Sequence, residues 1–168
     1  MRARVMLFSA ALAAFTVGLP SALAAEELEK LDVLGTEMIV KLDGRKTGGA
    51  MAVVETTVRP GDGPPKHVHT REDELFYILD GQFRIWRGEE VLDVGAGAVA
   101  FLPKNVPHTY KNTGTGPGRL LTTITPAGFE GFFREVSKRG LSAPKDMQEL
   151  TTLANQYGLQ FLGPPPQN

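Results

Sequence analysis

The pattern of hydrophobic and polar residues from Glu37 to Pro126 predicts a series of short β-strands. Apolar and β-branched runs alternate there with clusters of Gly, Pro, Asn and Asp. The runs are Met38–Leu42, Ala50–Arg59, Lys66–His69, Glu74–Leu79, Gln82–Arg87, Val91–Val94, Ala98–Leu102, His108–Asn112 and Arg119–Thr125. Regular turn signals between short strands are typical of an all-β sandwich or barrel. Residues 26–36 carry no comparable pattern, and we interpret them as a lead-in to the first strand.

The period of the apolar residues changes after Pro126 and predicts two helices. Phe129, Phe132, Phe133 and Val136 follow the i, i+3, i+4, i+7 spacing of an amphipathic helix over about 128–139. A second apolar stripe predicts a helix over about 146–158, which ends at Gly158. We expect both apolar faces to pack on the β-domain or on a second subunit, and we interpret the phenylalanine stripe as core packing.

The N-terminus has the organisation of a signal peptide. Arg2 and Arg4 precede an apolar stretch from Val5 to Leu19, and Ala22-Leu23-Ala24 matches an A-x-A cleavage site. We therefore expect residues 1–24 to be a signal peptide of the Sec type and the mature protein to be periplasmic or secreted. The alternative is a membrane anchor, but the apolar stretch is shorter than the ~20 residues that span a bilayer, so we expect no stable membrane span after cleavage.

Composition limits the chemistry that the chain can perform. The 168 residues suffice for one domain, expected over 25–168, and the net charge of −1 gives no basic surplus for binding nucleic acid. The sequence contains no cysteine, so it has neither a disulfide nor a thiolate nucleophile or ligand. Any reactive site must therefore be built from nitrogen and oxygen donors.

The three histidines of the chain point to a metal site. His67 and His69 are two apart on a predicted strand, so both side chains lie on the same face. Glu74 follows a short polar segment, and His108 opens a later strand. Three imidazoles and one carboxylate form a complete set of ligands for a divalent metal. A His-x-His pair alone is weak evidence, because a single histidine in a strand is more often an ordinary core or surface residue. We interpret Lys66 and Arg71 as solvated loop charges, like Glu72 and Asp73.

The residues around these histidines resemble the two motifs of the cupin superfamily. Gly61-x5-His67-x-His69-x4-Glu74-x6-Gly81 is similar to the first motif, over 61–81. Gly97-x5-Pro103-x-Asn105-x2-His108-x3-Asn112 is similar to the second, over 97–112, with Asn105 at a position where the family usually has glycine. Because asparagine tolerates a positive φ, this difference affects a turn and leaves the ligands intact.

This resemblance implies a fold and a set of ligands. It implies a double-stranded β-helix, or jelly-roll barrel, of two antiparallel sheets that holds a metal near one mouth, and usually a homodimer. The expected ligands are His67, His69, Glu74 and His108, and the closing helices resemble those of small quercetin dioxygenase-like cupins. The donor set is compatible with Fe, Mn, Ni, Co, Cu or Zn, one ion per chain.

Three functions remain open from the sequence. The first is a dioxygenase-like enzyme that acts on a small aromatic or dicarbonyl compound, with Glu74 as general base, as the resemblance suggests. The second is a non-oxidative metal-dependent isomerase, decarboxylase or lyase, and the third is a non-catalytic periplasmic module that binds metal or a small molecule. A divalent metal with one carboxylate favours an anionic oxygen donor as ligand. Four side chains are candidates for an apolar substrate pocket, although each also fits ordinary core packing: Phe76, Ile78, Phe101 and Tyr110.

Overall fold

The structure, a computed structural model, describes residues 27–164 and residue 166. The predicted signal peptide lies outside these residues. The strands are β1 (Glu29–Val33), β2 (Thr36–Leu42), β3 (Ala52–Val58), β4 (Lys66–His69), β5 (Asp73–Asp80), β6 (Gln82–Arg87), β7 (Glu90–Gly95), β8 (Val99–Leu102), β9 (His108–Asn112), β10 (Gly118–Thr125) and β11 (Leu159–Gly163). A short 3₁₀ helix (Gly44–Thr47) follows β2, and the helices α1 (Glu130–Arg139) and α2 (Met147–Gln156) lie between β10 and β11.

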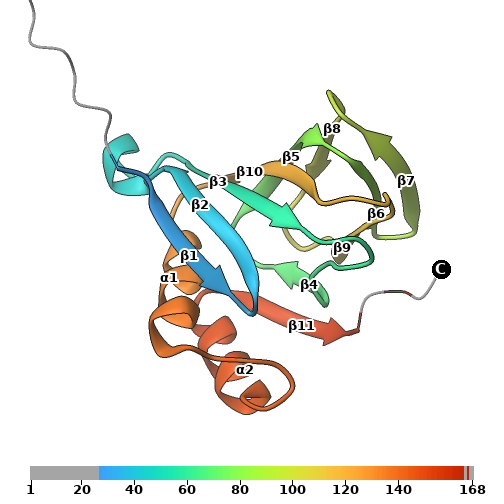
Figure 1. The fold of residues 1–168 in the computed structure, drawn as a ribbon. Helices are drawn as coiled ribbons and strands as arrows, with labels where there is room; N and C mark the ends of the chain where they lie inside the picture. Colours follow the sequence, from blue (N-terminus) through green and yellow to red (C-terminus); the bar gives the residue numbers. More distant parts are fainter. Residues whose placement is uncertain (1–26, 165, 167–168) are drawn as a thin grey trace, which may run out of the picture.

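The strands form two antiparallel sheets that face each other (Figure 1). The six-stranded sheet has the order β1-β2-β3-β10-β5-β8, and the five-stranded sheet has the order β11-β4-β9-β6-β7. Within the described residues, no strand pairing joins the two sheets. The fold is therefore the expected cupin double-stranded β-helix of two sheets, but the expectation of a barrel is corrected, because the barrel is not closed and each sheet keeps two edge strands.

The predicted strand runs correspond to β2 through β10, with ends that differ by a few residues. Two strands were not predicted from the sequence. β1 lies in the supposed lead-in and pairs along its whole length with β2. β11 follows α2 and pairs with β4, with Leu159 opposite His69. Its position beside the histidine-bearing strand makes it part of the wall around the candidate site.

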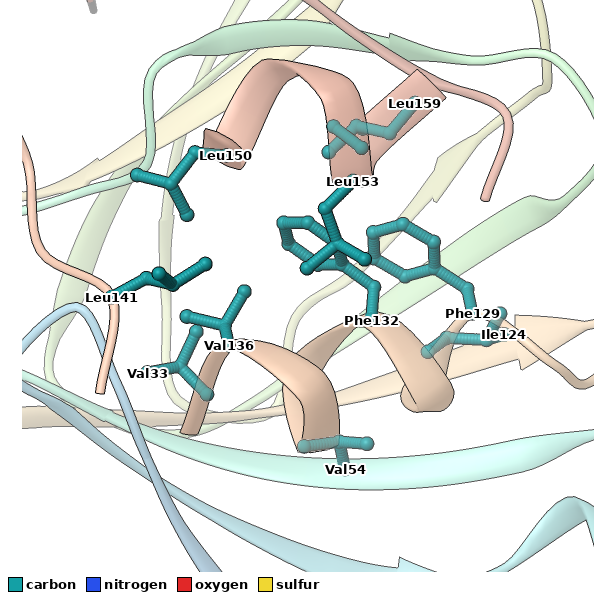
Figure 2. Close-up of a cluster of buried hydrophobic side chains, with 11 residues drawn as sticks. Val33, Val54, Ile124, Phe129, Phe132, Val136, Leu141, Leu150, Leu153 and Leu159 are labelled. Atoms are coloured by element: carbon teal, nitrogen blue, oxygen red, sulfur yellow. The ribbon is translucent and has the colours of Figure 1, made fainter. Parts of the chain in front are cut away.

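Both predicted helices are present, and they close one end of the sandwich. Apolar side chains from α1, α2 and the adjoining strands form one buried cluster, which includes Phe132, Val136, Leu150 and Leu153 (Figure 2). A second cluster fills the space between the sheets around Phe83 and Ile85. None of the described helices is long and apolar enough to cross a membrane.

Two backbone positions shape the loops that carry the ligands. Asn105 adopts a φ of 64°, as expected for the residue that replaces the usual glycine, and its N–H donates to the carbonyl of His69 at 2.7 Å. Gly63 passes so close to β9 that an added Cβ would lie 1.8 Å from the carbonyl oxygen of Tyr110. Only glycine fits there, so the segment between β3 and β4 is held against the strand that begins with His108.

Candidate metal centre

The four predicted ligands come together between the two sheets. Three of them are on the five-stranded sheet, His67 and His69 on β4 and His108 at the start of β9, where His67 is paired with His108. Glu74 is on β5 of the six-stranded sheet. One ligand atom from each residue lies within 4.8 Å of the others, and all four residues are buried.

Backbone carbonyls fix the orientation and tautomer of two imidazoles. Nδ1 of His67 lies 2.7 Å from the carbonyl oxygen of Pro65, and Nδ1 of His108 lies 3.0 Å from that of Val106. A carbonyl only accepts hydrogen bonds, so in each ring Nδ1 carries the proton and donates it. Nε2 of both neutral rings is then a lone-pair donor directed at the cluster, as metal coordination requires.

The third imidazole faces a carboxylate instead of a carbonyl. Nδ1 of His69 lies 3.5 Å from Oε2 of Glu72, and both side chains are almost fully buried. Among the described residues, these two atoms are the fully enclosed side-chain atoms that lack a hydrogen-bond partner. The interpretation of Glu72 as a solvated loop charge is therefore wrong. The turn after β4 directs this carboxylate inward, where it orients His69 so that Nε2 faces the cluster.

Glu74 places a carboxylate against the imidazole nitrogens, and this arrangement requires a cation between them. Its Oε2 lies 3.1 Å from Nε2 of His108, and its Oε1 lies 3.6 Å from Nε2 of His69. With the protons on Nδ1, these contacts bring lone pairs toward a carboxylate, and such an arrangement is stable only with a proton or a metal ion between the atoms. Three imidazole nitrogens and one carboxylate, all buried, fit one divalent transition metal.

The pKa shifts of the clustered side chains are consistent with metal binding. Burial, together with the nearby His108 and His69, lowers the pKa of His67 to about 3. Burial alone would raise the pKa of Glu74, but His69 and His108 outweigh it and lower the pKa to about 2. Burial acts to lower the pKa of His69, yet Glu74 and Glu72 together raise it. At neutral pH, His67 is neutral and Glu74 is ionised, which are the forms that bind metal.

The cluster forms part of the wall of a cavity of about 420 Å³ between the sheets. Most of the lining is apolar and comes from both sheets, from β11 and from the start of α1. Arg59, whose side chain is 67% exposed, also lines the cavity, so the cavity reaches the surface there. A small, mainly apolar molecule could therefore reach the ligand cluster.

Two of the four predicted pocket residues line the cavity, and the other two do not. Phe76 and Tyr110 line the cavity. Burial, with a smaller contribution from Glu74, raises the pKa of Tyr110, so its phenol stays protonated. Ile78 is buried in the core and does not border the cavity. The prediction for Phe101 is wrong, because its neighbours on β8 point inward and Phe101 is 49% exposed on the outer face.

Comparison with known proteins assigns the fold family. Residues 54–124 match the family model described as a cupin domain. This segment is a cupin domain. Quercetin 2,3-dioxygenase of Bacillus subtilis is 29% identical to the chain over 90 residues, which are 54% of this chain and 26% of that protein. Protein SchB of Streptomyces halstedii is 31% identical over 80 residues, which are 48% of this chain and 56% of SchB. The chain thus spans about a quarter of the length of the quercetin 2,3-dioxygenase and about half of the length of SchB.

Solved structures support the same fold. An RmlC-like cupin from Shewanella frigidimarina superposes with a TM-score of 0.54 and 21% identity, over 64% of this chain and 92% of that one. A predicted oxalate decarboxylase from Thermotoga maritima gives a TM-score of 0.53 and 24% identity, over 60% of this chain and 92% of that one. The chain thus has a cupin fold with a buried cluster of three histidines and one glutamate that is suited to a metal ion.

Sequence reasoning missed one group of residues around the cupin site. Phe129, Phe132 and Phe133, interpreted as core packing, also line the cavity. The ring of Phe129 contacts that of His69 edge-on, with 4.3 Å between centroids. Three phenylalanines within five residues, just after the last strand of the motif-bearing segment, were the available signal. Because their spacing is that of an amphipathic helix, the sequence was equally consistent with core packing.

Proposed function

We propose that this cupin is a metal-dependent enzyme with dioxygenase-like activity on a small aromatic or dicarbonyl compound. The observation that carries the proposal is the position of the ligand cluster, which opens directly onto an apolar cavity large enough for such a molecule. A purely structural metal site is normally closed on all sides by protein ligands. The name of the Bacillus subtilis relative, quercetin 2,3-dioxygenase, supports flavonols as the first compounds to test.

The metal would be held by His67, His69, Glu74 and His108, as one divalent ion of Fe, Mn, Ni, Co, Cu or Zn. When bound, it would supply Lewis acidity and open positions for an anionic oxygen donor. One carboxylate against a divalent ion leaves a net positive centre, which favours an enolate, a phenolate or a carboxylate over a neutral ligand.

The protein's own residues would position the substrate and take up its proton. Glu74 is ionised at neutral pH because its pKa is lowered to about 2, so it can accept a proton from an acidic substrate hydroxyl, although only as a weak base. The rings of Phe76 and Phe129 would hold an aromatic substrate and exclude water from the site.

Oxygen consumption tests this proposal. Metal-loaded protein should consume dioxygen when a flavonol or a β-diketone is added, and His108→Ala or Glu74→Gln should abolish the reaction. Glu89→Gln, an exposed carboxylate in the turn between β6 and β7, is the control and should react normally. Product formation without dioxygen would replace the proposal with isomerase, decarboxylase or lyase chemistry. Tight binding of these compounds with no product would indicate a binding module.

We also propose that the protein forms a homodimer. Tyr77, Val99 and Phe101 are exposed together on the outer face of the six-stranded sheet, where Tyr77 is paired with Val99 at the edge strand β8. An apolar group at a sheet edge is suited to contact with a second subunit. Light scattering measures the mass in solution, and a monomer at micromolar concentration would refute this assignment.

A further inference from the structure

Two buried threonines lie in the cavity wall away from the ligand cluster. Thr56 on β3 and Thr122 on β10 are 3% and 7% exposed, and both line the cavity. Apart from three of the four candidate ligands and the phenol of Tyr110, they are the buried polar groups of the cavity lining among the residues that the structure describes. The positions around them on the inner face of the six-stranded sheet are apolar, such as Val54, Phe76 and Leu120.

Among the described residues, the hydroxyl groups of these threonines have no hydrogen-bond partner. Within residues 27–164, neither Thr56 nor Thr122 makes a side-chain hydrogen bond. Thr109, which is equally buried, shows the usual arrangement, because its hydroxyl donates to the carbonyl oxygen of Pro64 at 2.6 Å. The hydroxyls of Thr56 and Thr122 are not among the fully enclosed atoms without partners, so they border the open space of the cavity.

The strand register places these hydroxyls on a diagonal that leads away from Glu74. Ile124 is opposite Glu74, Thr122 is opposite Phe76, and Thr56 is opposite Leu120. Thr122 is therefore displaced from Glu74 by two residues along the strands and by one strand across the sheet. Thr56 is displaced from Thr122 by the same amount in the same direction. With about 6.6 Å per two residues and about 4.8 Å between strands, the threonines lie about 8 Å and about 16 Å from Glu74.

We propose that Thr56 and Thr122 are specificity-determining residues that bind a second oxygen function of the substrate. The ligand class is an elongated, mainly apolar molecule that has an anionic oxygen donor at one end and a hydroxyl or carbonyl group farther along. A threonine hydroxyl both donates and accepts hydrogen bonds, so it suits either group. In an apolar wall, unpaired hydroxyls disfavour a ligand that lacks this oxygen. The assignment rests on the proposed metal-dependent function of the same cavity.

Two flavonols that differ by one hydroxyl test the inference. 3-Hydroxyflavone has the metal-binding pair of oxygens and the ring ether oxygen but no hydroxyl at its far end, whereas 3,4′-dihydroxyflavone has an additional hydroxyl there. Each is titrated into metal-loaded protein, and binding is followed by the change in flavonol absorbance. The variants are Thr56→Val and Thr122→Val, which remove the hydroxyl with little change in volume. Thr57→Val and Thr123→Val are matched controls, since they lie on the same strands but on the opposite face of the sheet.

The wild-type protein should bind 3,4′-dihydroxyflavone about tenfold more tightly than 3-hydroxyflavone, as one additional hydrogen bond implies. Thr122→Val, Thr56→Val or their combination should remove this preference without weakening the binding of 3-hydroxyflavone. The controls should keep it. Thermal unfolding should show that the threonine variants are as stable as the wild type, because no protein hydrogen bond is lost.

A preference that persists in the double variant would overturn the inference, and so would the absence of any preference or of flavonol binding in the wild type. The proposed function fails in a different way. If both flavonols bind with the expected preference but no dioxygen is consumed and no product forms, the threonines keep their role in binding and the dioxygenase-like activity is refuted.

Discussion

The contact between Glu72 and His69 leads to a prediction about metal affinity. Glu72→Gln removes the buried charge behind His69 while nearly preserving the size of the side chain. In the wild type, Oε2 of the carboxylate faces Nδ1 of His69 at 3.5 Å, which favours the proton on Nδ1, holds the ring with Nε2 toward the centre and increases the basicity of Nε2. The variant should therefore bind metal more weakly, although all four ligands are retained.

The geometry sets the size of this effect. Removing such a partner of a metal-bound histidine typically costs 10- to 100-fold in affinity. The 3.5 Å contact between Nδ1 and Oε2 is longer than a good hydrogen bond, and the glutamine oxygen can still accept the proton. We therefore expect the lower end of this range, a dissociation constant raised about tenfold, which corresponds to about 1.4 kcal/mol. The metal-free variant should be no less stable than the wild type, because the change removes a buried charge with no hydrogen bond.

Competition with a chromophoric chelator measures the affinity, and urea unfolding of the metal-free protein measures the stability. Glu89→Gln, which removes an exposed carboxylate in the turn between β6 and β7, is the charge-matched control and should bind metal like the wild type. If Glu72→Gln keeps the wild-type affinity within twofold, the carboxylate does not orient His69. A large loss of stability in the metal-free variant would instead assign Glu72 a structural role.

Three further predictions concern packing, pH and processing. Phe129→Ala should lower the free energy of unfolding by about 3–5 kcal/mol, because the ring is buried against His69; denaturant unfolding checks this, and a loss under about 1 kcal/mol would contradict it. Metal affinity should fall as the pH drops, beginning above the usual histidine range, because the pKa of His69 is raised and its proton competes with the metal; metal retention measured across a pH series tests the sign. The exported protein should begin at Ala25, and an intact mass that still includes residues 1–24 would refute the predicted cleavage.

The sequence predicted the ligand cluster well because its signal is local. His67 and His69 share a face by the two-residue period of a strand, and glycine and proline positions at fixed spacing identified the loops around them. β2 through β10 followed from the same alternation of strand and turn residues. β1 was missed because its sequence, EKLDV, has little apolar content, and it is a strand because it pairs with β2.

The error over Phe101 has a physical cause, which is the choice between the two faces of a strand. Phe101 is more hydrophobic than Ala100, yet Ala100 is buried and Phe101 is exposed. The pairing of Glu74 with Leu102 determines which residues of β8 point inward, because it places Leu102 and Ala100 on the buried face and Phe101 on the outer face. Likewise, the adjacent Thr56 and Thr57 are indistinguishable in sequence, and only the register of β3 with β10 turns Thr56 toward the cavity. Such pairings join residues far apart in the chain, so no local pattern encodes them.

The distribution of the ligands between the sheets connects the open sandwich to its chemistry. Three imidazoles are fixed on β4 and β9, two of them by backbone carbonyls that lie two residues before the ligand in sequence. The carboxylate alone comes from the facing sheet, on a strand whose hydrogen bonds run to β10 and β8. No strand pairing within the described residues links the two sheets. A metal at this centre would therefore link them by coordination, with Glu74 as the ligand from the six-stranded sheet. The residue proposed as base would thus also be the residue that connects the cavity wall of β5 and β10, which carries Thr122, to the histidines.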